Sequence, residues 1–105
     1  MTDIDKLNED IATYNSDVLF ILNKFKHTFG INATVEPVKI QNIQGFGSYR
    51  LSYINNVKYH IKQSYNQLEQ VLDSLHMKVP NLLLNRDVES IFVNTKKIKS
   101  QIERY

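Results

Sequence analysis

The sequence predicts an all-α protein, an antiparallel three-helix bundle with heptad-like seams, in which each helix buries one row of apolar residues. Three observations support this fold class. Apolar residues recur at alternating steps of three and four in three separate segments, which is the spacing of packed helical faces. Two connections, at about 31–46 and about 76–86, separate these segments and are long enough to reverse the chain direction. Acidic residues begin and basic residues end the first and third segments, as the helix dipole favours.

A chain of 105 residues is expected to form one helical-bundle domain spanning 1–105. Its composition, with 42% hydrophobic and 23% charged residues, is that of an ordinary soluble globule. Disordered chains combine low hydrophobicity with high net charge, and this sequence has neither. The apolar runs are far shorter than the roughly 20 residues that a membrane span requires, so we expect no contact with a membrane.

The first helix is expected from about Asp3 to about Phe29, and its apolar row is the most regular of the three. The members of this row share the three-and-four spacing: Ile4, Leu7, Ile11, Tyr14, Val18, Ile21 and Phe25. Thr2 is placed to cap the start of this helix, and Gly30 is placed to end it.

Residues 31–46 interrupt the helical pattern and predict an extended, partly buried connection with room for one short strand. Pro37 excludes a helix interior at this point. The stretch Gly45-Phe46-Gly47-Ser48-Tyr49-Arg50 resembles a phosphate-binding loop, but it lacks the Gly-Lys-Ser/Thr step of such loops. We interpret it as a turn in which Ser48 caps the next helix. Phe46 is then either tucked into the bundle end or displayed for a partner.

The second helix is expected from near Ser48 to near Leu75, and a hydrophobic loop at about 76–86 follows it. The predicted buried row of this helix is Leu51, Ile54, Ile61, Tyr65, Leu68, Leu72 and Leu75, with Val57 compensating for Lys58. The third helix is expected to start around Asp87. Its row is Val88, Ile91, Thr95, Ile98, Ile102 and Tyr105.

The sequence offers no pattern for catalysis, and we expect no enzymatic activity, no metal and no cofactor. There is no Cys, which excludes thiol nucleophiles, disulfides and cysteine-based metal sites. His27, His60 and His76 lie in three different segments, without a second ligand at helical spacing. The paired carboxylates at the start of the first helix are explained by the helix dipole.

Apolar and aromatic residues off the buried rows are the candidates for partner binding. At about 100° per residue, Tyr49, Tyr53 and His60 fall on the face of the second helix away from its buried row, and Phe20 points away from the row of the first helix. Together with Phe46, they form the predicted partner-binding set, because interfaces favour aromatic side chains. Alternatively, the connections cover these residues, which then have only a structural role.

The predicted function is a non-enzymatic protein–protein interaction module, an adaptor, an inhibitor or immunity-type factor, or an assembly subunit, acting by helix-face docking. The partner is another protein or a second copy of the chain. The alternative is a nucleic-acid-binding regulator that uses the basic end of the third helix: Lys96, Lys97, Lys99 and Arg104. A formal net charge of +2 is small for that role, and a solvated helix end explains the same residues.

Location and source are also indicated by the sequence. It begins Met-Thr-Asp-Ile-Asp, which is acidic where a signal peptide is basic, so we expect a cytoplasmic protein. Frequent Ile, Asn and Lys with scarce Arg indicate A/T-rich coding, and hence a low-GC bacterium or its phage.

Overall fold

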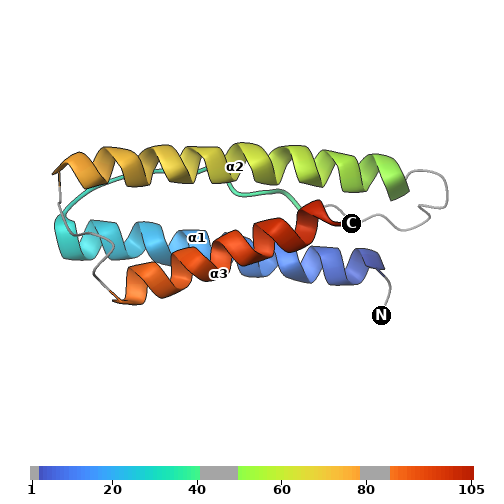
Figure 1. The fold of residues 1–105 in the computed structure, drawn as a ribbon, viewed down its shortest axis with the longest axis horizontal. Helices are drawn as coiled ribbons and strands as arrows, with labels where there is room; N and C mark the ends of the chain where they lie inside the picture. Colours follow the sequence, from blue (N-terminus) through green and yellow to red (C-terminus); the bar gives the residue numbers. More distant parts are fainter. Residues whose placement is uncertain (1–2, 41–49, 79–85) are drawn as a thin grey trace.

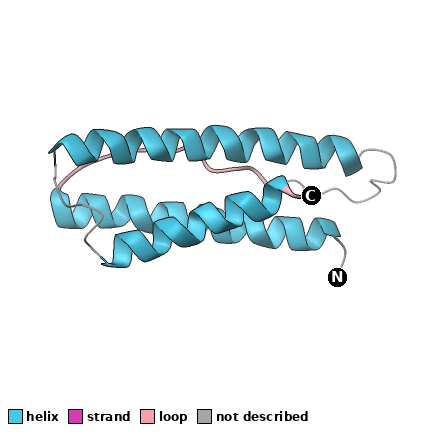
Figure 2. Ribbon diagram, in the orientation of Figure 1, coloured by secondary structure: helices cyan, strands magenta, loops and turns pink. Residues whose placement is uncertain are grey.

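The computed structural model describes residues 3–40, 50–78 and 86–105, which form three helices and their connections (Figure 2). The helices are α1 (Asp3–Phe29), α2 (Arg50–Lys78) and α3 (Arg86–Glu103). The predicted all-α bundle of three helices is confirmed, and α1 has the predicted bounds. Across the described ranges no strand is present, so residues 31–40 do not form the strand considered for the first connection.

α1 and α2 run in the same direction, and α3 runs against both (Figure 1). Hydrogen bonds between α1 and α2 show the same parallel direction. Tyr53 bonds to Asn8, and Ser64, further along α2, bonds to Tyr14, which is further along α1. The second connection therefore reverses the chain as expected. The predicted reversal at the first connection is wrong, because residues 31–40 run back along α1 and α2 then starts at the same end of the bundle as α1. A short connection can make this return, since an extended residue advances about 3.3 Å and a helical residue only about 1.5 Å.

α1 packs against α3 in an antiparallel pair with polar contacts at regular intervals. Three contacts share this arrangement: Lys24 Nζ to Asp87 Oδ2 at 3.4 Å, Asn94 Nδ2 to Asp17 Oδ2 at 2.6 Å, and Tyr105 OH to Asp10 Oδ2 at 3.2 Å. Their α1 members are seven residues apart in sequence. One stripe of α1 thus faces α3 along the length of the pair.

The predicted buried row of α1 is confirmed. Its members all lie in the core: Ile4, Leu7, Ile11, Tyr14, Val18, Ile21 and Phe25. α1 also ends at the predicted glycine. Gly30 has a φ of 67°, in the left-handed region, and its N–H donates to the Lys26 carbonyl at 3.0 Å.

The buried row of α2 differs from the prediction in its first turns. Leu51, predicted to be buried, is 69% exposed, and Tyr53, predicted to lie on the outer face, is only 5% exposed. Further along, the prediction holds for Ile61, Tyr65, Leu68, Leu72 and Leu75. A straight helix drifts by about 20° per heptad against a strict three-and-four repeat. Tyr53 also lies on a flank of α2 that faces α1 and lines one groove with residues 36–39.

α3 completes the core with four of the six residues predicted for it, and the other two, Ile91 and Tyr105, are partly buried. Val88, Thr95, Ile98 and Ile102 are buried, and the Thr95 hydroxyl donates to the Ile91 carbonyl at 2.8 Å. Against α2, the ring of Phe92 stacks on that of Tyr65 with centroids 5.9 Å apart. α3 therefore joins α1 through polar and apolar contacts and α2 through an aromatic contact.

The three helices give an elongated body with principal extents of 49 × 20 × 19 Å. Of the helices described, none is both long enough and apolar enough to cross a bilayer. α2 continues to Lys78, three residues past the predicted end. The leucines at 82–84, predicted to form a hydrophobic loop, lie outside the described residues.

Candidate functional site

Residues 31–40, here named the strap, lie along the bundle between α1 and α2 (Figure 1). The strap has no regular secondary structure, and helix side chains hold its backbone. From α1, Asn15 Nδ2 donates to the Val38 carbonyl at 2.7 Å, and Asn15 Oδ1 accepts from the Val38 N–H at 2.9 Å. From α2, Gln67 Oε1 accepts from the Glu36 N–H at 3.1 Å. Polar side chains thus fix the strap where a sheet would use a neighbouring strand.

Val38 anchors the strap in the core. Its side chain is 3% exposed and belongs to the apolar cluster that the three helices share. Ile31 and Val35 are partly buried and pack against the same cluster. At the end of the described segment, Ile40 is 48% exposed. The strap therefore has one deep anchor and two shallow ones.

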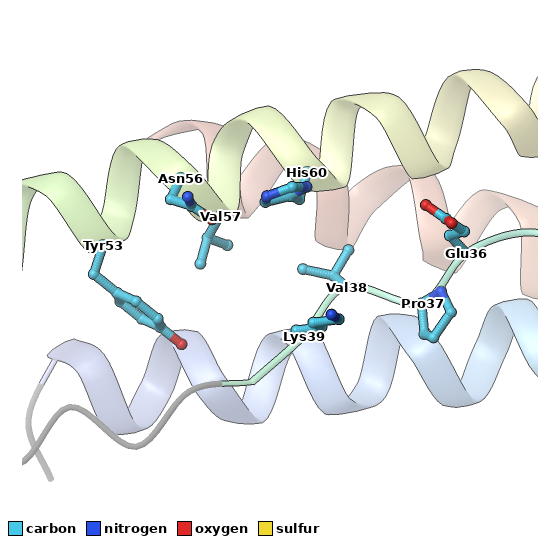
Figure 3. A pocket seen from close by; sticks show the side chains of 8 residues that line it. All are labelled: Glu36, Pro37, Val38, Lys39, Tyr53, Asn56, Val57 and His60. Carbon is cyan, nitrogen blue, oxygen red and sulfur yellow. The ribbon is translucent and has the colours of Figure 1, made fainter.

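A groove of about 410 Å³ lies between the strap and α2 (Figure 3). Residues from the strap and from two turns of α2 line it: Glu36, Pro37, Val38, Lys39, Tyr53, Asn56, Val57 and His60. In Figure 3, Val38 points from the strap toward α2, and Val57 points from α2 toward the strap. The groove consequently has an apolar base and polar groups at its rim.

Tyr53 closes one end of this groove and does not project into solvent. Its ring extends from α2 toward α1 (Figure 3), where its hydroxyl donates to Asn8 Oδ1. The prediction that Tyr53 is displayed for a partner is therefore wrong, because its side chain is buried. Tyr53 instead connects the two parallel helices beside the strap.

His60 is exposed on the rim of the groove, away from the buried row, as predicted. Its ring is edge-on to that of Tyr59, with centroids 5.4 Å apart and an interplanar angle of 76°. Glu36 and Lys39 supply one negative and one positive charge from the strap side. These groups can hydrogen-bond or pair with a polar ligand.

A second hollow, of about 360 Å³, lies on the α1 side of the strap and is mainly apolar. Its lining is Asn15, Ser16, Val18, Leu19, Leu22, Val35 and Pro37. Leu19 is 59% exposed there, and Phe20, the next residue of α1, is 51% exposed. The predicted exposure of Phe20 is confirmed, whereas Leu19 was missed. The signal for Leu19 is the apolar run 18–22, which is too continuous for one face of a helix to bury.

The basic residues of the nucleic-acid alternative do not form one free cluster. Lys96, Lys97 and Arg104 are exposed. Lys99 is partly buried, with its Nζ 3.4 Å from Glu103 Oε1 and 4.9 Å from the centroid of the Tyr65 ring. Lys99 is therefore engaged within the bundle.

Buried hydroxyl groups lie at the centre of the bundle. The Tyr14 hydroxyl donates to Ser64 Oγ at 3.0 Å, and both residues are buried. Burial raises the pKa of Tyr14 to about 12, against the opposing effect of the Ser64 hydrogen bond. Burial, followed by the neighbouring Glu69 and Tyr14, raises the pKa of Tyr65 to about 12. Within the described part of the chain, the buried Tyr65 hydroxyl has no hydrogen-bond partner.

Two members of the predicted partner-binding set, Phe46 and Tyr49, lie outside the described residues, as does the turn that contains them. In the ranges 3–40, 50–78 and 86–105, no three His, Cys, Asp or Glu residues gather as metal ligands do. No protein-family model, curated protein or solved structure matches the chain. The candidate site therefore rests on geometry alone.

Proposed function

We propose that this protein is a non-enzymatic protein–protein interaction module that docks through the outer face of α1. The observation that carries the proposal is the exposure of two consecutive large apolar side chains, Leu19 and Phe20. Neither belongs to the row that packs α1 into the bundle, which Val18 and Ile21 occupy at this level. A partner that covers them gains about 25 cal/mol for each Å² of apolar surface removed from water.

The apolar hollow beside Leu19 extends this face. Val18, Leu22, Val35 and Pro37 line the hollow, so a partner side chain can enter it while the partner backbone covers Leu19. Single exposed apolar residues are normal on any protein surface. Phe20, which follows Leu19 along α1, adds an exposed aromatic side chain, a type that is enriched at interfaces. The module is then an adaptor, an inhibitor or an assembly subunit.

The structure offers less support for the nucleic-acid alternative. Phosphate binding requires free cationic side chains. Lys99 is held by Glu103 and by the Tyr65 ring. Of the four candidate residues, Lys96, Lys97 and Arg104 remain exposed, on a chain whose net charge is +2. The test below therefore includes nuclease treatment, which distinguishes a nucleic-acid partner from a protein partner.

Photo-crosslinking tests the proposal directly. A photoreactive benzoylphenylalanine replaces Phe20 in the full chain, and light is applied in the cells that naturally express the protein. The matched control places the same group at Val93, which is 59% exposed on α3. A covalent protein adduct of defined mass is expected from position 20, and little from position 93.

The adduct should survive nuclease treatment and should weaken when Leu19→Ser is added. An adduct at twice the 12.3 kDa chain mass identifies a second copy as the partner. Equal labelling from positions 20 and 93, or an adduct that nuclease removes, would contradict docking through α1.

A further inference from the structure

The strap lies on α1 and α2 as a bound peptide would. Its backbone groups are held by helix side chains, Asn15 at Val38 and Gln67 at Glu36. Hydrogen bonds to a backbone do not depend on the side chains of the segment that they hold, which is how many peptide-binding grooves accept extended ligands. Selection for shape comes mainly from the site of the buried Val38 side chain, with smaller contributions from Ile31 and Val35.

Hollows border the strap on both flanks. A groove of about 410 Å³ separates its second half from α2, and a hollow of about 360 Å³ lies beside Val35 and Pro37 on α1. A third, of about 330 Å³, lies between residues 31–34 and α2. Interiors are normally close-packed, so a segment bordered by hollows forfeits dispersion contacts that a core helix makes. Segments of this kind open at lower free energy than the whole fold.

The three helices have contacts with each other that do not involve the strap. α1 and α3 are joined by Lys24 with Asp87 and by Asp17 with Asn94. α1 and α2 meet through Tyr14 with Ser64, and α2 and α3 through Tyr65 with Phe92. None of these contacts involves a residue of the strap.

We propose that the space between α1 and α2 is a peptide-binding groove that the chain occupies with its own strap, and that a partner protein enters it by presenting an extended segment. The strap defines the chemistry of that segment. The partner segment carries a β-branched apolar residue at the position that Val38 occupies. The residue before it favours extended geometry, as Pro37 does in the strap. Its backbone N–H and C=O at the anchor position meet Asn15. The strap residues Val35 and Pro37 also line the hollow beside Leu19, but the two proposals are tested separately, because the residue changed here is Val38 and the crosslinking variants change α1 and α3.

A competition experiment tests the groove. The probe is a fluorescent synthetic peptide with the sequence of residues 31–40, and the control peptide carries V38D. The receptors are the full chain and its V38D variant, whose own strap has lost the apolar anchor. The intact strap competes at an effective concentration on the order of millimolar, so the variant should bind the unchanged peptide about tenfold more tightly, or better, than the wild type does.

The control peptide should not bind either receptor. Equal affinity of the two receptors, or no binding by a V38D chain that retains its helical circular dichroism, would overturn the proposal. Sedimentation at the same concentrations tests whether the strap of a second copy occupies the groove instead. A wild-type dimer that the peptide cannot dissociate would assign the groove to the strap of a second copy and would overturn entry by a partner segment.

If the V38D chain does not fold, hydrogen exchange of the wild type decides. The Val38 N–H donates to Asn15, and we expect it to exchange through local opening at least about tenfold faster than the N–H groups of the buried residues Ile11 and Ile21. Exchange of Val38 at the rate of Ile11, with the same dependence on urea, would show that the strap leaves only when the protein unfolds. That result would overturn the proposal.

Discussion

The side-chain amide of Asn15 makes two hydrogen bonds with the backbone of Val38, a residue 23 positions away in the sequence. An asparagine amide presents a donor and an acceptor side by side, as the backbone of a neighbouring strand does. Asn15 therefore replaces a strand partner and holds an extended segment against a helix. Together with Gln67 and the buried Val38 side chain, Asn15 sets the position of the strap, and with it the position of the groove in Figure 3.

Asn15→Ala should destabilise the protein by about 1–3 kcal/mol, because it leaves a partly buried N–H and C=O of the strap without their partner. The matched control is Asn23→Ala, at an exposed position of the same helix, which should change stability by at most about 0.5 kcal/mol. Urea unfolding followed by circular dichroism at 222 nm measures both. Equal effects of the two substitutions would show that Asn15 does not hold the strap.

The corrected buried row of α2 gives a second prediction. Tyr53→Ala should cost about 3–5 kcal/mol, as for other large aromatic residues in a core, whereas Leu51→Ala should cost at most about 0.5 kcal/mol. Tyr53→Phe should cost about 1 kcal/mol, because it removes only the hydrogen bond to Asn8. The same urea experiment ranks the three variants. A Leu51 variant that is less stable than the Tyr53→Ala variant would restore the row expected from sequence.

Leu51 and Tyr53 also show why the sequence predicts the buried row of one helix better than that of another. In α1, the apolar row and the C-terminal glycine are both local signals, and they agree with the structure at every position of the row. In α2, Tyr53 is buried on a flank that faces Asn8 of α1 and the groove beside the strap, and the strap has no helical or strand pattern of its own. A helical projection treats every unpaired flank as solvent, so it reverses the environments of Leu51 and Tyr53.

The strap itself was predictable as an extended connection, but its path was not. Pro37 and the loss of the three-and-four spacing indicate where the helix pattern stops. That the strap lies between two parallel helices follows from its contact with Asn15, and an asparagine in a helix looks like an ordinary surface residue. The groove was therefore missed, although its rim residue His60 was selected for its position off the buried row.

Gly30 gives a third prediction about the junction of α1 and the strap. Its φ of 67° is unfavourable for residues with a Cβ, but a Cβ added there would meet no atom within 4 Å. Gly30→Ala should thus cost about 1–2 kcal/mol from backbone strain alone. Gly30→Asn should cost less, since Asn tolerates the left-handed region. Thermal unfolding of both variants measures the difference, and equal melting temperatures for Ala and Asn would contradict the backbone origin of the effect.

The buried tyrosines predict that stability falls in alkaline solution. Below pH 10, Tyr14 and Tyr65 are protonated in both the folded and the unfolded chain. Because burial raises the pKa of each from 10.0 to about 12, the unfolded chain releases these protons first as the pH rises. The free energy of unfolding should therefore fall between about pH 10 and pH 12. Urea unfolding at intervals across this range measures the slope.

Lysines also lose their charge in this range, so the prediction concerns a difference between variants. Tyr14→Phe removes one of the two raised groups, and the stability of that variant should fall less steeply with pH than that of the wild type. The matched control is Tyr59→Phe, because Tyr59 is 60% exposed on α2 and its ring is edge-on to that of His60, which is also exposed. This control should follow the wild-type slope. Parallel slopes for the Tyr14 variant and the wild type would show that the Tyr14 hydroxyl ionises as readily in the folded chain as in the unfolded one, which its burial against Ser64 should prevent.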